Sequence, residues 1–290
     1  MRRCLRCDAA ITAADWQCSA CGNAPQRING FPAFAPALAV DNDGYDDRYF
    51  AELFRLESGN YWFRARNALL IWALQRYFPQ ARDYLEIGCG TGYVLFGVAA
   101  GRPGLKLHAS EISSRGLPFA AGRVPQAELL QMDARAIPFV EHFDIIGMFD
   151  VLEHIEDDRG VLAQACRALR PGGGLIITVP QHRFLWSRYD EHAHHVRRYA
   201  ADEIAEKVTA AGFRIMMTTS FVSLLLPLML LSRRARPAPQ GAYDVLAELK
   251  VGAVTNTLLA AALAFERGLI RCGIRFPVGG SRLLLAQRME

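Results

Sequence analysis

Three glycines alternate with other residues directly after the apolar segment 83–87. They are Gly88, Gly90 and Gly92, and Glu86 stands two residues before the first of them. At a turn from a strand into a helix, glycines let the backbone approach a ligand closely, and the unpaired amides at the helix start favour polar or anionic groups. A dinucleotide site has its glycines at the spacing G-x-G-x-x-G, which this segment lacks. The segment therefore predicts a site for another nucleotide-like cofactor.

Acidic residues follow two further apolar segments. Leu105–Ser110 predicts a second strand that carries Glu111 to the same edge as the glycines, where a carboxylate can bind both hydroxyls of a ribose. A third strand at 128–131 leads to Asp133. Because helical segments alternate with these strands, we expect a parallel sheet with crossover helices.

The pattern Glu-x-Gly-x-Gly-x-Gly at the end of a first strand resembles motif I of the class I S-adenosylmethionine (SAM) dependent methyltransferases. The resemblance covers about residues 60–220, is closest to a bacterial subgroup (methyltransferase-domain types 11 and 12), and includes the aromatic segment 61–67. It implies SAM as the cofactor, with Asp133 near the adenine amino group; a metabolite-binding Rossmann domain is the main alternative. The residues that the resemblance places around SAM are Glu86, Gly88, Gly90, Gly92, Glu111, Ile112, Asp133, Ala134 and Phe149.

The fold implied for the chain is α/β: a doubly wound, seven-stranded Rossmann-like methyltransferase sheet with a small N-terminal zinc ribbon and a helical insertion before the last strand. We expect the remaining strands at 143–149, 175–179, 215–219 and, antiparallel, 281–287. We assign residues 1–25 to the ribbon, 26–47 to a linker, and 48–290 to the methyltransferase domain, with the apolar insertion at 220–279.

Four cysteines near the N-terminus have the spacing of two zinc knuckles. They form the pairs Cys4-x-x-Cys7 and Cys18-x-x-Cys21. Four thiolates suit a closed, tetrahedral structural zinc site, and so short a segment cannot build a sufficient core without such a staple. Disulfides are the competing interpretation, which a cytosolic location disfavours.

Three prolines mark the stretch after the ribbon as an extended connector, and an acidic run continues it over 41–47. Such a linker would leave the ribbon able to dock or to move. Zinc ribbons often recognise RNA or protein, but the acids Asp8 and Asp15 offset part of the basic charge near the knuckles. We therefore rank RNA second as a substrate and do not expect nucleic acid as a partner.

Two histidines stand after the fourth and fifth strands, at the ligand edge of a doubly wound sheet. We predict that His154 or His182 is the base that removes the acceptor's proton; a helix cap for the first and a water-exposed loop residue for the second are the alternatives. If a helix begins at Asp150, then Asp150, Glu153 and His154 share one face. That face has the donor atoms to hold a divalent metal, a question that the sequence leaves open.

A polar and aromatic segment at 186–199 predicts the acceptor-side loop. Arg197 and Arg198 lie in it, and they either hold an anionic group of the acceptor or pair with Asp190 and Glu191 to pin the loop.

The insertion contains two apolar stretches, 221–231 and 251–265, each followed by arginines. Both are too short to span a bilayer as helices. Apolar segments flanked by arginines lie in a membrane interface or accept a lipid tail, so we predict membrane-surface contact through 221–236 and 251–267; a helical pair that covers the sheet or forms a homodimer is the alternative.

The formal charge of +4 does not by itself argue for nucleic acid. The chain has no apolar run at its start that would form a signal peptide, so we expect a cytoplasmic protein, peripheral at the inner face of the membrane if the insertion contacts lipid. The predicted function is SAM-dependent O-methylation of a hydrophobic or lipid-linked small molecule. The alternatives are an RNA or protein methyltransferase that docks through the ribbon and a non-catalytic SAM-binding scaffold.

Overall fold

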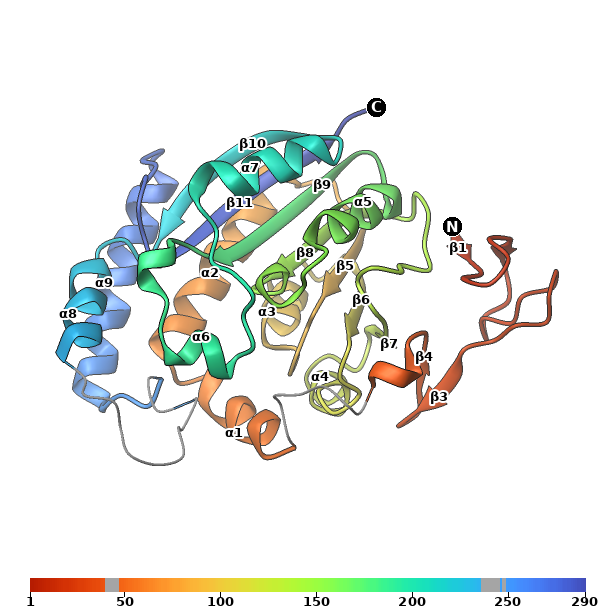
Figure 1. Cartoon of the computed structure of the whole chain (residues 1–290), viewed down its shortest axis with the longest axis horizontal. Coiled ribbons are helices and arrows are strands. Elements are labelled where there is room, and N and C mark those ends of the chain that lie inside the picture. Colours follow the sequence, from red (N-terminus) through yellow and green to blue (C-terminus); the bar gives the residue numbers. More distant parts are fainter. Residues whose placement is uncertain (40–46, 236–245, 247–248) are drawn as a thin grey trace.

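A nine-stranded sheet with helices on both faces forms the centre of the molecule (Figure 1). The computed structural model describes residues 1–39, 47–235, 246 and 249–290. The strand order is β10-β11-β9-β8-β5-β6-β7-β4-β3. The strands are β3 (Gln26–Ile28), β4 (Phe31–Ala33), β5 (Asp83–Ile87), β6 (Lys106–Glu111), β7 (Glu128–Gln131), β8 (Phe143–Phe149), β9 (Leu169–Pro180), β10 (Phe213–Phe221) and β11 (Ser281–Arg288).

Helices connect the strands in the order of a doubly wound fold. They are α1 (Asp47–Glu57), α2 (Tyr61–Tyr77), α3 (Tyr93–Gly101), α4 (Leu117–Arg123), α5 (Asp158–Ala168), α6 (Arg188–His192), α7 (Ala201–Ala210), α8 (Leu226–Ala235) and α9 (Ala253–Arg271). β5 pairs in parallel with both β6 and β8, so the strand order reverses at β5. A crevice at the carboxyl ends of the strands on either side of such a reversal is where doubly wound sheets bind ligands.

The expected fold class is confirmed. All seven predicted strands are present, and β11 lies antiparallel between β9 and β10. The fifth strand is longer than predicted, because β9 begins at Leu169, which pairs with Phe143, and runs through the glycine segment 172–174. A register shift between Phe143 and Ile145 accommodates the additional residues.

Side chains of the central strands alternate between two hydrophobic clusters. Leu85 and Ile87 face the cluster that contains α5 and α7, whereas Tyr84 faces the cluster that contains α2 and α3. A strand whose two faces are both covered has to be apolar on both. This requirement explains why β8 is apolar over 145–149 and β9 is apolar over 175–177.

The ribbon packs on one edge of this sheet, which differs from our expectation of a free linker at 26–47. β3 and β4 form a hairpin, and β4 pairs in parallel with β7 through Ala33 and Gln131, so residues 26–33 extend the sheet. The ribbon, red in Figure 1, lies at the edge beyond β7. The acidic part of the predicted linker, 40–46, lies outside the described residues.

Trp16 fastens the ribbon to the domain. Its side chain is 2% exposed and belongs to the same cluster as Leu85 and Ile87. The ring makes edge contacts with Phe34 and Phe139, and the guanidinium of Arg2 lies 4.3 Å from its centroid. The ribbon therefore shares its core with the larger domain, and the prolines at 25–36 do not make a flexible connector.

The helical insertion lies at the opposite end of the molecule (Figure 1). α9 packs on α2, and the Glu266 carboxylate accepts hydrogen bonds from the amides of Val222, Ser223 and Leu224 at 2.6–2.8 Å. This carboxylate joins α9 to the end of β10. The side chains of Arg233 and Arg234 and all of Arg236 lie outside the described part of the chain.

α9 is longer than its apolar stretch, because the helix continues to Arg271 and spans 19 residues. Among the described residues it is the one helix whose length and composition would let it cross a membrane, and 17% of its apolar window is buried. Our expectation that this segment is too short to span is therefore wrong on length, although Glu266 and the packing against α2 join one side of α9 to the protein.

Trp16→Ala should lower the free energy of unfolding of the whole protein by about 3–5 kcal/mol, the usual cost of truncating a large buried aromatic side chain. Trp186→Ala, at a tryptophan that is 39% exposed, is the control. Urea denaturation followed by circular dichroism measures both. An unchanged free energy of unfolding in Trp16→Ala would show that the ribbon folds apart from the domain.

Candidate cofactor and acceptor site

The glycine loop after β5 turns through three residues in the left-handed region. Gly88, Gly90 and Gly92 have φ of 70°, 53° and 78°. A Cβ on Gly88 would lie 2.5 Å from Val151 Cγ2, and one on Gly92 would lie 2.8 Å from the Ala120 Cα. A Cβ on Gly90 would meet nothing within 4 Å. Two of the glycines are thus required by packing, and the third lies beside open space that a ligand can enter.

Two carboxylates flank this loop, of which Glu86 is buried and Glu111 is half-buried. Glu111, at the end of β6, accepts hydrogen bonds from the amides of Gly90 and Ile112, both at 2.8 Å, and of Ser113 at 3.1 Å. Burial raises the pKa of Glu111 despite these bonds. Glu86 is 2% exposed, accepts a hydrogen bond from the Tyr84 hydroxyl at 3.1 Å, and has a pKa raised by burial to about 8. Both predicted acids therefore lie at the loop.

Asp133 follows β7 at the same edge and forms a fork with Arg135. The Arg135 Nε lies 3.0 Å from Asp133 Oδ1, and its Nη2 lies 2.7 Å from Oδ2. Burial works to raise the pKa of Asp133, but the hydrogen bonds and charge of Arg135 outweigh it and lower the pKa. Ala134 and Phe149 are both 7% exposed. The carboxyl ends of β5, β6, β7 and β8 thus bring the predicted cofactor residues to one edge of the sheet.

The start of the domain closes over the glycine loop, which sequence reasoning missed. Glu57, at the end of α1, accepts hydrogen bonds from the Thr91 hydroxyl and from Arg123, both at 2.5 Å. Thr91 lies between two of the loop glycines. The only signal in the sequence was an acid at the end of a helix, and nothing local indicated a partner 34 residues away.

On the other side of β5, the residue after β8 has a strained backbone. Asp150 has φ of 57°, an uncommon conformation for a residue with a side chain. Its carboxylate pairs with Arg66 of α2, whose guanidinium lies 4.4 Å from the ring centroid of Trp62. No helix begins at Asp150: a short 3₁₀ turn covers Leu152–His154, so the three predicted metal ligands do not share a helical face.

A cluster of histidines and acids lies beside that turn. The Glu153 carboxylate, the His154 ring and the His195 ring place one possible ligand atom each within 4.8 Å of one another. The two rings meet edge to face at 4.7 Å between centroids. His195 Nδ1 lies 2.8 Å from Asp190 Oδ1, and this contact orients the His195 ring. His195 was not among the predicted site residues.

Burial governs the charges in this cluster. Burial and the neighbouring His195 lower the pKa of His154 to about 3, so its imidazole is neutral at neutral pH. Burial works to raise the pKa of Asp190, but hydrogen bonds from His195 and Arg198 outweigh it and lower the pKa. Asp190 therefore stays ionised, and its two partners are fixed in place.

His182 follows β9 apart from that cluster. Its backbone has φ of 65°, and its ring stacks on Phe184 at 4.8 Å between centroids. Its Nε2 is buried and has no hydrogen-bond partner among the described residues. Burial, together with the charges of Arg282 and Arg198, lowers its pKa. The ring therefore carries a lone pair that is available at neutral pH.

The arginines of the acceptor-side loop pair with acids, one as predicted and one differently. Arg198 bonds Asp190 at 2.7 and 3.0 Å. Arg197 bonds Asp158 at 2.5 Å and Glu156 at 2.8 Å, and not Glu191. Both arginines thus pin the loop to the domain.

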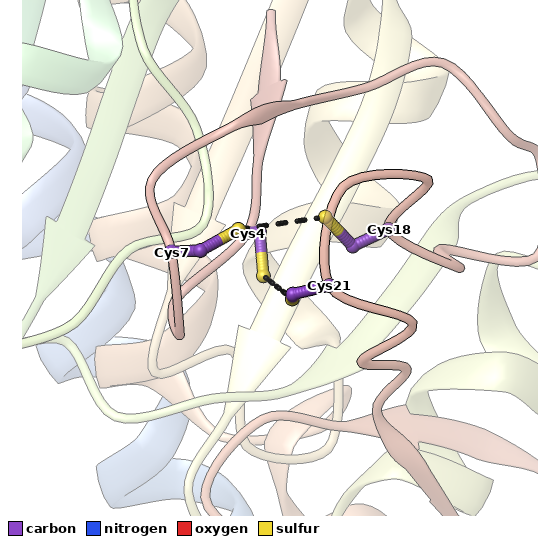
Figure 2. Close-up of side chains that lie close together, drawn as sticks. All are labelled: Cys4, Cys7, Cys18 and Cys21. Atoms are coloured by element: carbon purple, nitrogen blue, oxygen red, sulfur yellow. Dashed lines mark hydrogen bonds between the residues drawn. The ribbon is translucent and has the colours of Figure 1, made fainter.

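The four ribbon cysteines converge at the other edge of the sheet (Figure 2). The Sγ atoms of Cys4 and Cys21 lie 3.6 Å apart, as do those of Cys7 and Cys18, and none is in a disulfide. Sulfur atoms on a tetrahedral zinc ion are separated by about 3.8 Å, given a Zn–S distance of about 2.3 Å. The cluster therefore has the donor set and the spacing of a Cys₄ zinc site.

A family model described as a methyltransferase domain matches residues 60–217, more than half of the chain. The chain belongs to the methyltransferase-domain family. This match includes the glycine loop, both flanking acids and the histidine cluster, so the class I SAM-dependent methyltransferase fold predicted from motif I is confirmed.

Relatives agree with this assignment over part of their length. The chain is 29% identical over 163 residues to a probable S-adenosylmethionine-dependent methyltransferase of Mycobacterium tuberculosis, covering 54% of this chain and 57% of the relative. It is 25% identical to the malonyl-[acyl-carrier protein] O-methyltransferase of Hahella chejuensis, covering 64% and 71%. The fold resembles phosphoethanolamine N-methyltransferase 2 of Haemonchus contortus in complex with SAM (TM-score 0.57, 20% identity, 85% of this chain and 58% of that one).

Alanine substitutions at two glycines of the loop after β5 should have different effects on stability and on SAM binding. Gly92→Ala should destabilise the fold by about 2–5 kcal/mol, because it combines a left-handed backbone with an overpacked contact. Gly90→Ala should cost only the backbone strain of about 1–2 kcal/mol but weaken SAM binding at least tenfold, since its methyl enters the open space.

Thermal denaturation and calorimetric titration with SAM separate the two effects. Gly122→Ala, in an open position outside the left-handed region, is the control. Equal SAM affinity in the wild type and in Gly90→Ala would show that the cofactor does not occupy the space beside Gly90.

Proposed function

We propose that this protein transfers the methyl group of SAM to an oxygen atom of a hydrophobic or lipid-linked small molecule. The observation that supports it most is the open space at Gly90 between Glu86 of β5 and Glu111 of β6, in a chain of the methyltransferase-domain family. A sulfonium donor is already activated, so the protein has chiefly to position the acceptor and remove its proton.

The residues at the loop fit SAM by their chemistry. The Glu111 carboxylate accepts one backbone amide on Oε2 and two on Oε1, so Oε2 keeps a lone pair for a ribose hydroxyl. Asp133 and the Ile112 amide would lie at the adenine end, and Glu86 at the amino-acid end near Gly88. Arg66 and Asp150 then lie between the cofactor and the acceptor loop, where a rigid ion pair helps to exclude water.

His182 is the histidine that we assign as the base. Its Nε2 is buried without a partner in the described structure, whereas the ring of His154 donates to the Ala193 carbonyl and lies against His195. Proton removal by a positioned histidine contributes about 10²–10⁴-fold to rate. A hydroxyl acceptor has to lose its proton to such a base. The Hahella relative, an O-methyltransferase, supports oxygen as the acceptor atom.

The surface of the insertion favours a lipid-linked acceptor. Val254, Leu258 and Phe265 on α9 are 75%, 65% and 64% exposed, and α8 adds Leu228 and Leu231. A surface that contacts only water rarely carries so many large apolar side chains together. Arginines 267 and 271 lie on the same helix, and basic residues beside an apolar face attract anionic lipid. We infer that this face meets the membrane surface; a homodimer is the competing occupant.

The second candidate is a methyltransferase for RNA or protein that uses the ribbon for docking. The burial of Trp16 against the domain argues against a mobile ribbon, and the salt bridge from Arg2 to Glu128 at 2.6 Å uses one of its basic side chains. We propose instead that zinc on Cys4, Cys7, Cys18 and Cys21 is structural: all four ligands are protein atoms, so no position is open for catalysis. A non-catalytic scaffold is the third candidate. Turnover of SAM with any acceptor would exclude it.

His182→Gln should lower kcat at least 100-fold with phenolic or polyprenyl-linked hydroxyl acceptors and radiolabelled SAM. The base works when deprotonated, and its pKa is lowered from 6.5, so wild-type kcat should hold as pH falls to 6.5 and decline only below that value. His194→Gln, at an exposed histidine, is the control. An unchanged kcat in His182→Gln would show that this histidine is not the base.

Binding to vesicles that contain phosphatidylglycerol should weaken at least tenfold in Phe265→Glu, because burying one large apolar side chain is worth about 1.5–3 kcal/mol. Phe96→Glu, at a 50% exposed phenylalanine on α3, is the control. Cosedimentation measures binding, and sedimentation velocity measures mass. A dimer that Phe265→Glu dissociates, with no vesicle binding by the wild type, would instead assign the face to a second copy.

A further inference from the structure

The Glu153 carboxyl group is buried without a hydrogen-bond partner of its own. The residue is 1% exposed, and neither carboxylate oxygen has a hydrogen-bond partner from another described residue. The two nearest arginines already have acids of their own, because Arg66 pairs with Asp150 and Arg198 with Asp190. A buried carboxylate in such a position is costly unless a cation joins it.

Each of the two imidazoles beside this carboxyl group has one nitrogen engaged in a hydrogen bond, which leaves the other nitrogen with a lone pair. Asp190 only accepts hydrogen bonds, so its contact with His195 Nδ1 at 2.8 Å places the proton there and leaves Nε2 with a lone pair. The His154 ring donates to the Ala193 carbonyl, which leaves its other nitrogen as an acceptor. A carboxylate or carbonyl that fixes the tautomer of a histidine in this way is typical of metal-ligating histidines.

We propose that Glu153, His154 and His195 bind a divalent ion of the first transition series, with Asp190 as the residue that positions His195. The three ligand atoms lie within 4.8 Å of one another. Ligand atoms of one such ion lie within about 4.4 Å of each other, twice a metal–ligand distance of about 2.2 Å, so the side chains have to close by a few tenths of an ångström at most.

The donor set selects the class of ion. Two imidazoles and one carboxylate suit zinc, iron or manganese, whereas magnesium and calcium prefer oxygen ligands. Three protein ligands leave further coordination positions for water or for an acceptor oxygen. The turn that carries Glu153 is joined to the acceptor-side loop by the hydrogen bond from the Val196 amide to the Glu153 carbonyl at 2.7 Å. If the proposed function holds, the ion would hold and acidify the acceptor's hydroxyl.

Metal binding tests the site without any assay of methyl transfer. The full chain, with zinc retained in the ribbon, is dialysed against a mild chelator, its metal content is determined, and it is titrated with Mn²⁺ and with Zn²⁺ by calorimetry. We expect one ion per chain beyond the ribbon zinc. Glu153→Gln and His195→Gln should each weaken binding more than 100-fold, and Asp190→Asn about 10–100-fold. His194→Gln, at the exposed neighbouring histidine, should bind as the wild type does.

Circular dichroism checks that each variant is folded. Because Glu153→Gln and His195→Gln each remove a different ligand, one folded variant of the two is enough for the test. Cobalt in place of the second ion should give d–d bands without the thiolate charge-transfer bands of a cysteine site. A folded, SAM-binding wild type that takes up no ion beyond the ribbon zinc would overturn the proposal, and so would unchanged affinity in both ligand variants. In either case Glu153 is a protonated acid, and the proposed methyl transfer remains to be judged by turnover.

Discussion

The close approach of the glycine loop to the helices around it is the constraint on which the site depends. β5 ends between β6 and β8, and the chain has to leave the sheet without filling the crevice between them. It does so through three left-handed glycines, one of which leaves no room for a Cβ against Ala120. That tight packing of α3 on α4 is what keeps the space beside Gly90 open.

Beside this space Glu86 is buried and Glu111 is half-buried, and this placement determines their pKa values. Glu86 and Glu111 have raised pKa values because burial penalises their charge, and backbone amides or a tyrosine hydroxyl only partly offset that cost. A ligand with hydroxyl or ammonium groups relieves the same cost. On the acceptor side, arginines neutralise Asp150 and Asp190 instead, so these two acids serve to fix neighbouring side chains.

Elements defined by apolar runs could be predicted from the sequence, and contacts between distant residues could not. β7 and β8 were predicted to the residue because their apolar runs are bounded by polar turns. The hairpin of β3 and β4 was missed, since strands of three residues carry no periodic signal and β4 contains a proline. A helix that begins at Asp150 was considered from the sequence, and the structure instead has a left-handed backbone there, at the turn after β8. His195 was passed over because only the fold brings it to His154 and Glu153.

The central claim is that the crevice at β5 binds SAM, and calorimetric titration of the full chain with SAM and with S-adenosylhomocysteine tests it most directly. The account predicts that both bind at one site per chain with micromolar dissociation constants, because both carry the ribose and adenine that the acids of β6 and β7 would hold. Absence of heat and of any thermal stabilisation in a folded, zinc-loaded sample would contradict it.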